Sequence, residues 1–201
     1  MNTKTKTLIF GIGLTIGLVL MIFLLCKFGS EAEAAGSEFR INSATDNDQN
    51  NQAVAVDNQN RFYIVWEDNR EQIGRYDIYG RIFDSKGNAI TTDANALDAN
   101  NIDSCHVPSL AINNIGNVYL VWQDKNRAPE QYGGDNIFAR LLRYFPGNTE
   151  DLGTALQGPG GNNSDFRVNN DVGTEYTCNN PIVATNGINF VTSYFNWQKP
   201  Q

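Results

Sequence analysis

The sequence predicts an all-β protein whose body consists of repeated, antiparallel four-stranded units, preceded by an N-terminal hydrophobic helix. A block of residues that begins at Ala53 returns at Pro108 and again, in weaker form, at Pro181. β-Branched and aromatic residues gather in short runs, and Asn, Asp and Gly separate those runs, which is typical of strands joined by turns. The first thirty-odd residues show neither feature and need a separate interpretation.

The N-terminal segment predicts export. Nineteen residues, Leu8–Cys26, carry no charge. As a helix this run is about 28 Å long, close to the ~30 Å hydrocarbon core of a membrane. Its length favours an uncleaved anchor in the membrane, whereas Ala32-Glu33-Ala34 favours a signal peptide cleaved near Ala34. A lipoprotein signal at Cys26 is a third alternative, disfavoured by the large Leu25. All three place the rest of the chain outside the cytoplasm.

The chain therefore divides into residues 1–34 and a body of residues 35–201. The body carries twelve Lys and Arg against twenty Asp and Glu, a net charge of −8. An acidic surface repels phosphate backbones, which argues against nucleic acid as a partner. The two cysteines of the body, Cys105 and Cys178, are too few for a disulfide framework. They occupy equivalent places in neighbouring units, three residues before the repeat proline. Either the two cysteines form a disulfide with each other or both remain free thiols.

Four short strands are expected in each repeat. In the first unit the first three are residues 53–56, 62–66 and 78–83, and a fourth has the pattern Phe-Arg-Ile/Val-Asn, found at residues 39–42 and 166–169. The second strand is apolar at nearly every position. An antiparallel strand with one wet face would alternate. Burial of both faces is what a central strand acquires when four-stranded sheets stack face to face around an axis.

These patterns resemble the repeats of bacterial sialidase-like β-propeller proteins. The shared features are an aliphatic run that ends in Trp-x-Asp, then Asp-Ile-Tyr-Gly-x-hydrophobic-Phe-Asp and Phe-Arg-Val-Asn, over residues 37–197. The Asp-box of the catalytic sialidases, Ser/Thr-x-Asp-x-Gly-x-Thr-Trp, is absent. The resemblance implies an incomplete or open β-propeller of about two and a half four-stranded antiparallel blades, at about 37–92, 93–163 and 164–201. Three repeats cannot close a ring, so truncation and an open array that self-associates through its strand edges are both considered.

An Asp and an Arg follow the second strand in two units, as Asp68 with Arg70 and Asp124 with Arg127. An Arg at such a loop can hold a carboxylate or a sugar acid, with the Asp as a general acid. An active site, however, occurs once per propeller, whereas this set recurs. We therefore expect a structural role in which Asp caps the turn and pairs with Arg. Binding by these residues together with Arg167 is the alternative.

Two further positions were considered for chemistry. Asp46 and Asp48 offer oxygen ligands at alternating positions, as calcium loops do, but Asn51 stands where such a loop has Gly. A surface turn is expected there, with weak Ca²⁺ binding as the alternative. His106 is the only histidine, and without a second ligand or a Ser nucleophile motif it predicts neither a zinc site nor a triad.

The sequence thus favours an exported or surface-anchored β-repeat protein that acts as a binding module, with a protein or a glycan as its partner. No catalytic residue, metal or cofactor is assigned. The alternative is part of a sialidase-like, glycan-acting enzyme whose catalytic residues lie on blades outside this sequence. That alternative requires Arg70, Arg127 and Arg167 to point into one pocket.

Overall fold

A computed structural model of the chain describes residues 38–95, 104–125, 134–158, 165–170 and 176–198. The chain divides into two units, residues 1–39 and 40–201, and every strand described below lies in the second. The predicted membrane segment at residues 8–26 and its cleavage site lie outside the described residues. Among the residues that are described, none belongs to a helix of the length and hydropathy needed to cross a membrane.

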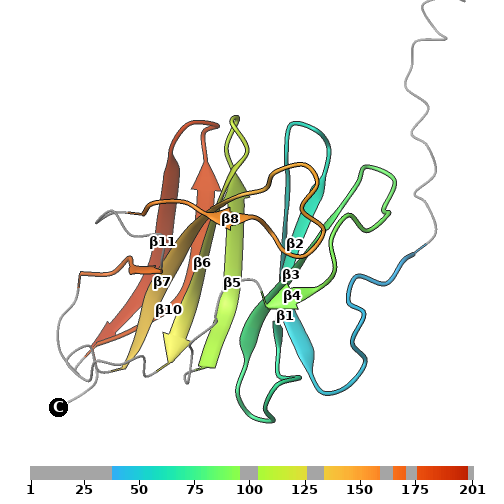
Figure 1. The fold of residues 1–201 in the computed structure, drawn as a ribbon. Coiled ribbons are helices and arrows are strands. Elements are labelled where there is room, and N and C mark those ends of the chain that lie inside the picture. The colour runs from blue at the N-terminus through green and yellow to red at the C-terminus, as the bar shows by residue number, and fades with distance from the viewer. Residues whose placement is uncertain (1–37, 96–103, 126–133, 159–164, 171–175, 199–201) are drawn as a thin grey trace, which may run out of the picture. The chain divides into compact units, whose positions relative to one another are not determined.

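Three antiparallel sheets contain all the described strands (Figure 1). Sheet A consists, in spatial order, of β1 (Gln49–Val56), β2 (Phe62–Asp68), β3 (Asp77–Phe83) and β4 (Ala94–Asn95). Sheet B consists of β5 (Ser104–Ile112), β6 (Asn117–Lys125), β7 (Asp135–Arg143) and β8 (Thr154–Ala155), and β9 (Phe166–Arg167) also pairs with β7. Sheet C consists of β10 (Tyr176–Thr185) and β11 (Phe190–Gln198). The all-β class is confirmed for this part of the chain, and none of the three sheets is closed.

The repeat seen in the sequence is also a repeat of backbone geometry. In each sheet the pairing of the first two strands is interrupted by one irregularity at the same point. The residue there has a left-handed backbone, with φ of 49° at Asn51, 50° at Val107 and 50° at Asn180. Asn accepts this conformation readily, whereas β-branched Val does not. Aligning the three copies at their bulges shows which residues are equivalent. In the second strands, Val65, Val121 and Ser193 then occupy the same position of the repeat.

Each repeat turns from its first strand into its second by the same hydrogen bonds. The side-chain oxygen of Asp57 accepts the backbone N–H groups two and four residues further on, at 2.8 and 3.0 Å. Asn113 does the same at 3.2 and 2.9 Å. Asn186 accepts from the residues two and three positions later, at 3.0 and 2.8 Å. Such side-chain acceptors explain why Asp and Asn punctuate the sequence between its strands.

Sheet B packs between the other two sheets. Alternating residues of β6 enter different cores: Leu120 and Trp122 pack with Tyr63 of sheet A, whereas Val121 packs with Val183 of sheet C. All five side chains are at most 7% exposed, and burial of each contributes about 2 kcal/mol. Both faces of β6 are therefore buried, as the lack of a polar face predicted.

The outer face of sheet A is covered by a segment that precedes the first strand. Ile64, Trp66, Tyr79 and Phe83 form a third buried cluster on this face, and Ile41 packs against it. The pattern Phe-Arg-Ile-Asn at residues 39–42 forms no strand, which corrects the prediction for this copy. The fourth strand of sheet A is β4 instead, because Ala94 pairs with Gly80. Of the other copy, residues 166–169, only Phe166–Arg167 form a strand, and this strand, β9, pairs with β7 of sheet B although the expected third unit began at residue 164.

Candidate functional site

The predicted pair of Asp68 and Arg70 forms a closed network at the end of β2. Asp68 is fully buried, and its carboxylate accepts the backbone N–H of Arg70 at 2.9 Å, its Nη2 at 2.5 Å and the indole N–H of Trp66 at 3.0 Å. The guanidinium of Arg70 also reaches Asp93 at 3.3 Å and lies 4.0 Å from the centre of the Tyr79 ring. Burial works to lower the pKa of Arg70, but the two carboxylates outweigh it and raise that pKa. The cation is thus held by residues of its own sheet.

The other predicted residues do not join this network in the described structure. Asp124 is buried in β6, with its Oδ2 4.0 Å from the sulfur of Cys105. Arg167 lies in β9, where its Nη1 is 3.5 Å from the amide oxygen of Asn136. Arg127 lies outside the described residues. Among the residues predicted for the site, hydrogen bonds join Asp68 to Arg70, and Asp124 lies within reach of the Cys105 thiol.

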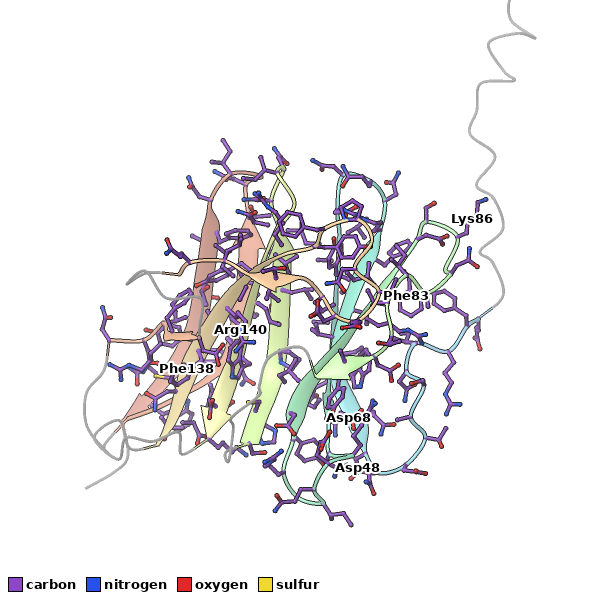
Figure 2. All side chains as sticks on the ribbon, in the orientation of Figure 1. Asp48, Asp68, Phe83, Lys86, Phe138 and Arg140 are labelled. Atoms are coloured by element: carbon purple, nitrogen blue, oxygen red, sulfur yellow. The ribbon has the colours of Figure 1, made fainter. Side chains whose placement is uncertain are left out.

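Asp46 and Asp48 lie in an exposed stretch before β1. Asp48 lies beside the end of β2, where its backbone oxygen accepts the N–H of Asn69 at 3.3 Å (Figure 2). Asp48 accepts the hydroxyl of Tyr76 at 3.4 Å, and the backbone oxygen of Asp46 accepts the side-chain amide of Gln49 at 2.7 Å. Within the described ranges, no group of three or more His, Cys, Asp or Glu side chains is arranged to hold a metal ion. Calcium binding at this stretch stays a prediction.

The disulfide considered from the sequence is not formed. Cys105 and Cys178 are buried thiols. Cys105 belongs to the core shared by sheets A and B, whereas Cys178 belongs to the core shared by sheets B and C. The two cysteines occupy the same position in two stacked sheets, and stacked sheets lie about 10 Å apart. This spacing exceeds the ~7 Å between Cα atoms that a disulfide allows.

A carboxylate on β2 connects sheet A to sheet B. Glu67 Oε1 accepts the backbone N–H of Val107 and the side-chain amide of Asn51, both at 2.6 Å. Glu67 Oε2 lies 3.0 Å from His106 Nδ1, and His106 Nε2 lies 2.8 Å from Ser104 Oγ. The side chain of Glu67 is 2% exposed. We call these five residues the Glu67 clamp, because they bind a strand of sheet A to the bulge of β5.

Ser, His and a carboxylate follow one another in the Glu67 clamp, in the order that hydrolase triads use. Ser104 Oγ also accepts the backbone N–H of Tyr76 at 2.9 Å, which is a further contact between β5 and the segment before β3. Glu67 meanwhile accepts the backbone N–H of Val107 in sheet B. The geometry therefore fits a contact that holds two sheets together. No local pattern predicts this contact, because the partners of Glu67 lie 39 and 40 residues away along the chain.

Hydrogen bonds from its neighbours keep the carboxyl group of Glu67 ionised. Burial works to raise the pKa of the Glu67 carboxyl, but the hydrogen bonds from His106, Val107 and Asn51 outweigh burial and lower that pKa below its ordinary value. The carboxylate is thus charged at neutral pH, although it is buried.

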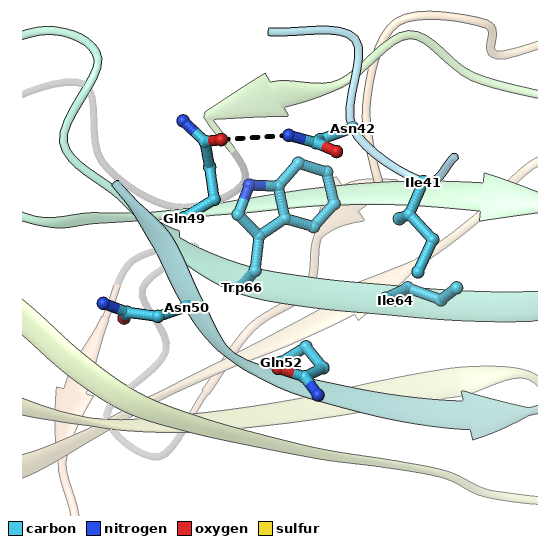
Figure 3. A pocket seen from close by; sticks show the side chains of 7 residues that line it. All are labelled: Ile41, Asn42, Gln49, Asn50, Gln52, Ile64 and Trp66. Carbon is cyan, nitrogen blue, oxygen red and sulfur yellow. Dashed lines mark hydrogen bonds between the residues drawn. The ribbon is translucent and has the colours of Figure 1, made fainter. Parts of the chain in front are cut away.

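A shallow cavity of about 170 Å³ lies on the outer face of sheet A. Apolar side chains and four side-chain amides line it together, as Figure 3 shows: Ile41, Ile64, Trp66, Asn42, Gln49, Asn50 and Gln52. The amide of Asn42 donates to Gln49 at 3.0 Å. Trp66 is only 4% exposed and offers little ring surface to a ligand. The cavity is therefore a seam where the segment before β1 closes over sheet A.

Among the described residues, several exposed apolar side chains gather on the outer face of sheet C. Four apolar side chains are exposed to similar extents: Ile182 (64%), Val191 (68%), Phe195 (64%) and Trp197 (67%). They share one face, because alternate residues of β11 point the same way and Ile182 pairs directly with Ser193. The other face of the sheet packs on sheet B, where the ring of Phe190 stacks on that of Tyr119 at 5.1 Å. We call the four exposed residues the sheet C surface.

The residue pattern of the third copy contains a signal for the sheet C surface. At the position where β2 has Glu67 and β6 has Gln123, β11 has Phe195. Two residues further on, the polar residues of the first two copies are replaced by an aromatic one: Asn69 and Lys125 by Trp197. The third copy therefore exchanges polar residues for aromatic ones at the positions that are exposed.

In the part of the chain that the structure describes, the fold is an all-β repeat with an exposed apolar face on sheet C. A comparison of the chain with protein-family models, with curated proteins and with solved structures finds no match.

Proposed function

We propose that this chain is an exported or surface-anchored binding module that uses the sheet C surface to bind another protein. The observation that carries the proposal is the exposure of Ile182, Val191, Phe195 and Trp197 on one face, each above 60%. Contiguous exposed apolar side chains on a soluble domain mark an interaction site. Large aromatic residues are also the side chains that dominate protein interfaces.

Equivalent faces of the other two sheets support the proposal. Tyr63 and Val65 occupy the corresponding places in β2 and are 0% exposed, because sheet B covers them. Val121 in β6 is also 0% exposed and packs in the core shared with sheet C. The repeat thus provides this face with a covering layer twice, and the third copy presents it to a partner.

The proposal includes an open β-propeller arrangement, of the sialidase-like type that the repeats resemble. In its favour, β5 contacts both β1 and β10, so the first strands of successive sheets are neighbours, as they are around a propeller axis. Export rests on the uncharged run at residues 8–26, which either anchors the chain in a membrane or is removed near Ala34.

A photo-activated cross-linking residue tests the binding function in the cells that produce the chain. Placed at Val191, which is 68% exposed, it should give one discrete cross-linked species; placed at Ile115, which is 69% exposed but lies in the turn of sheet B, it should give none. The species at Val191 should disappear when Phe195 and Trp197 are both changed to Ser. Equal cross-linking at both positions, or none at Val191, would overturn the proposal.

A further inference from the structure

A cavity of about 290 Å³ lies where the turn between β1 and β2 meets the turn between β5 and β6. The side-chain amide of Asn58 in the first turn donates to the backbone oxygen of Asn114 in the second at 2.9 Å, so the two turns are joined. The chain that follows β7 forms a third wall with Tyr144 and Pro146. The cavity is thus built by sheets A and B, and no residue of the sheet C surface lines it.

The charged side chains that line this cavity, among the described residues, are those of Arg61 and Arg143. The charge of Arg61 is balanced, because its Nε and its Nη2 each lie 2.6 Å from Asp57 Oδ2. Arg143 donates its Nε to the side-chain oxygen of Asn117 at 2.7 Å, and within the described residues it forms no ion pair with a carboxylate. The cavity therefore carries one positive charge that the described chain does not balance.

This arrangement of Arg143 differs from that of the other half-buried arginines. Five of them have an Asp oxygen within 3.9 Å of the guanidinium: Arg61, Arg70, Arg75, Arg81 and Arg140. Carboxylates are also plentiful, since the body has twenty Asp and Glu against twelve Lys and Arg. A partly buried cation without a counter-charge loses hydration without compensation. A carboxylate from a ligand would give Arg143 what the other five receive from the chain.

Both guanidinium groups are held in place by their neighbours. Arg61 donates its Nη2 to Gln59 Oε1 at 3.1 Å, and its guanidinium carbon lies 4.7 Å from the centre of the Tyr144 ring. That ring packs edge-on against the ring of Tyr63, with centres 6.3 Å apart. Arg143 is fixed through Nε, which leaves its Nη1 and Nη2 groups as a planar pair of donors. Donors that are already ordered lose less conformational freedom when a ligand binds.

We propose that this cavity binds a small hydroxylated monocarboxylate through Nη1 and Nη2 of Arg143. A carboxylate matches a guanidinium with two parallel hydrogen bonds. The single unbalanced charge suits a monoanion better than a phosphate monoester, which carries a charge of about −1.5 to −2 at pH 7. The side chains of Gln59 and Asn114 also line the cavity, and their amide groups can bind ligand hydroxyls. This site is separate from the sheet C surface and does not depend on the function proposed for it.

Saturation-transfer difference NMR with the full-length chain in detergent micelles tests the charge requirement, with gluconate as the probe. Gluconamide is the matched control ligand, because it keeps the hydroxyl groups and replaces the carboxylate with a neutral amide. Gluconate should bind saturably and about tenfold or more tightly than gluconamide, since hydrogen bonds between two charged groups are stronger than neutral ones. Equal binding of the two ligands, or no binding of gluconate, would overturn the proposal.

Arg143→Gln locates the site. The amide of Gln can still donate to Asn117, whereas the charge and the paired donors are lost, so the affinity for gluconate should fall about tenfold or more. Arg40→Gln is the matched control, because it removes one charge from an exposed arginine that does not line the cavity, and it should change the affinity by less than about twofold. An equal fall in both variants would overturn the site. The comparison of gluconate with gluconamide uses the natural chain, so it decides the matter even if Arg143→Gln does not fold.

Two competition outcomes would also overturn the inference. Inorganic phosphate that displaces gluconate and binds more tightly than gluconate would show that the cavity prefers a more highly charged anion. The chain with Phe195→Ser and Trp197→Ser should bind gluconate like the natural chain, and loss of binding would place the probe on the sheet C surface instead. Cross-linking at Val191 reports on the binding of a protein partner alone, so either proposal can fail while the other stands.

Discussion

Replacing Glu67 with Gln removes one buried charge and leaves the shape of the Glu67 clamp unchanged. The amide oxygen of Gln can still accept the two 2.6 Å hydrogen bonds from Val107 and Asn51. The amide N–H can donate to His106 Nδ1 if the imidazole carries its proton on Nε2, which then donates to Ser104. No partner is lost, so the difference from the natural chain isolates the effect of the charge.

The loss of stability caused by Glu67→Gln follows from the number of hydrogen bonds whose acceptor changes from charged to neutral. Hydrogen bonds to a charged group contribute about 1.5–3 kcal/mol each, and neutral ones about 0.5–1.5 kcal/mol. Two bonds to Oε1 that each weaken by about 1 kcal/mol predict a loss of about 2 kcal/mol in the free energy of unfolding at pH 7. Glu67→Ala should cost more, about 3–5 kcal/mol, because it leaves the N–H of Val107 buried without an acceptor.

The charge also predicts how this loss depends on pH. The folded-state pKa of Glu67 lies below the ordinary value of 4.5. A carboxyl whose pKa is lowered by folding stabilises the folded state fully above its unfolded pKa, and this stabilisation is lost as the pH falls through the folded pKa. The natural chain and Glu67→Gln should therefore differ most above about pH 5 and converge at lower pH.

Urea unfolding between pH 3 and pH 8, followed by tryptophan fluorescence, measures the difference. Glu150→Gln is the matched control, because it removes one charge from an exposed side chain and should change the free energy by less than about 0.5 kcal/mol at every pH. A difference between the natural chain and Glu67→Gln that stays constant down to pH 3, or that is absent at pH 7, would refute the charge-based account.

Three other substitutions test the packing. Gly80→Ala should destabilise by about 1–3 kcal/mol, because the new Cβ meets Leu152 at 2.6 Å, and the double variant with Leu152→Ala should cost less than the sum of the two in urea unfolding. Leu120→Ala should cost about 2–5 kcal/mol, because Leu120 is 0% exposed, whereas Ile115→Ala at 69% exposed should stay within about 0.5 kcal/mol. Val107→Asn should raise the melting temperature, since Asn accepts the positive φ of 50° that Val resists; a lower melting temperature would show that the side chain of Val107 packs usefully.

The strands and turns of the first two copies were predictable because each rests on local chemistry. The unbroken apolar run at β2 predicted burial on both faces, and the Asx residues at position 57 and at position 113 predicted the turns that their side chains now cap. The strand predicted at residues 39–42 does not form, because a strand also needs a neighbouring strand to pair with. The copy at residues 166–169 has such a neighbour in β7, whereas residues 39–42 lie outside any sheet.

The candidate sites were less predictable, because they depend on contacts between copies. The pairing of Asp68 with Arg70 was predictable, because the two residues are separated by only two positions in the sequence. The Glu67 clamp joins residues about 40 positions apart, and nothing in the sequence periodicity brings Glu67 to His106. The sequence contains the aromatic residues of the sheet C surface, Phe195 and Trp197. Their orientation away from the core, however, follows only from the register of β10 with β11.

The unequal covering of the three sheets has a consequence for motion. Stability in stacked repeats is a sum over neighbouring layers. Within the described residues, sheet B packs on a layer at each side, sheet A packs on sheet B and on the segment around Ile41, and sheet C packs on sheet B. Amide protons of β11 should therefore exchange with solvent sooner than those of β6, through openings that leave the other sheets intact. A partner that docks on sheet C would slow the exchange of β11 first, so hydrogen exchange in this strand would report binding.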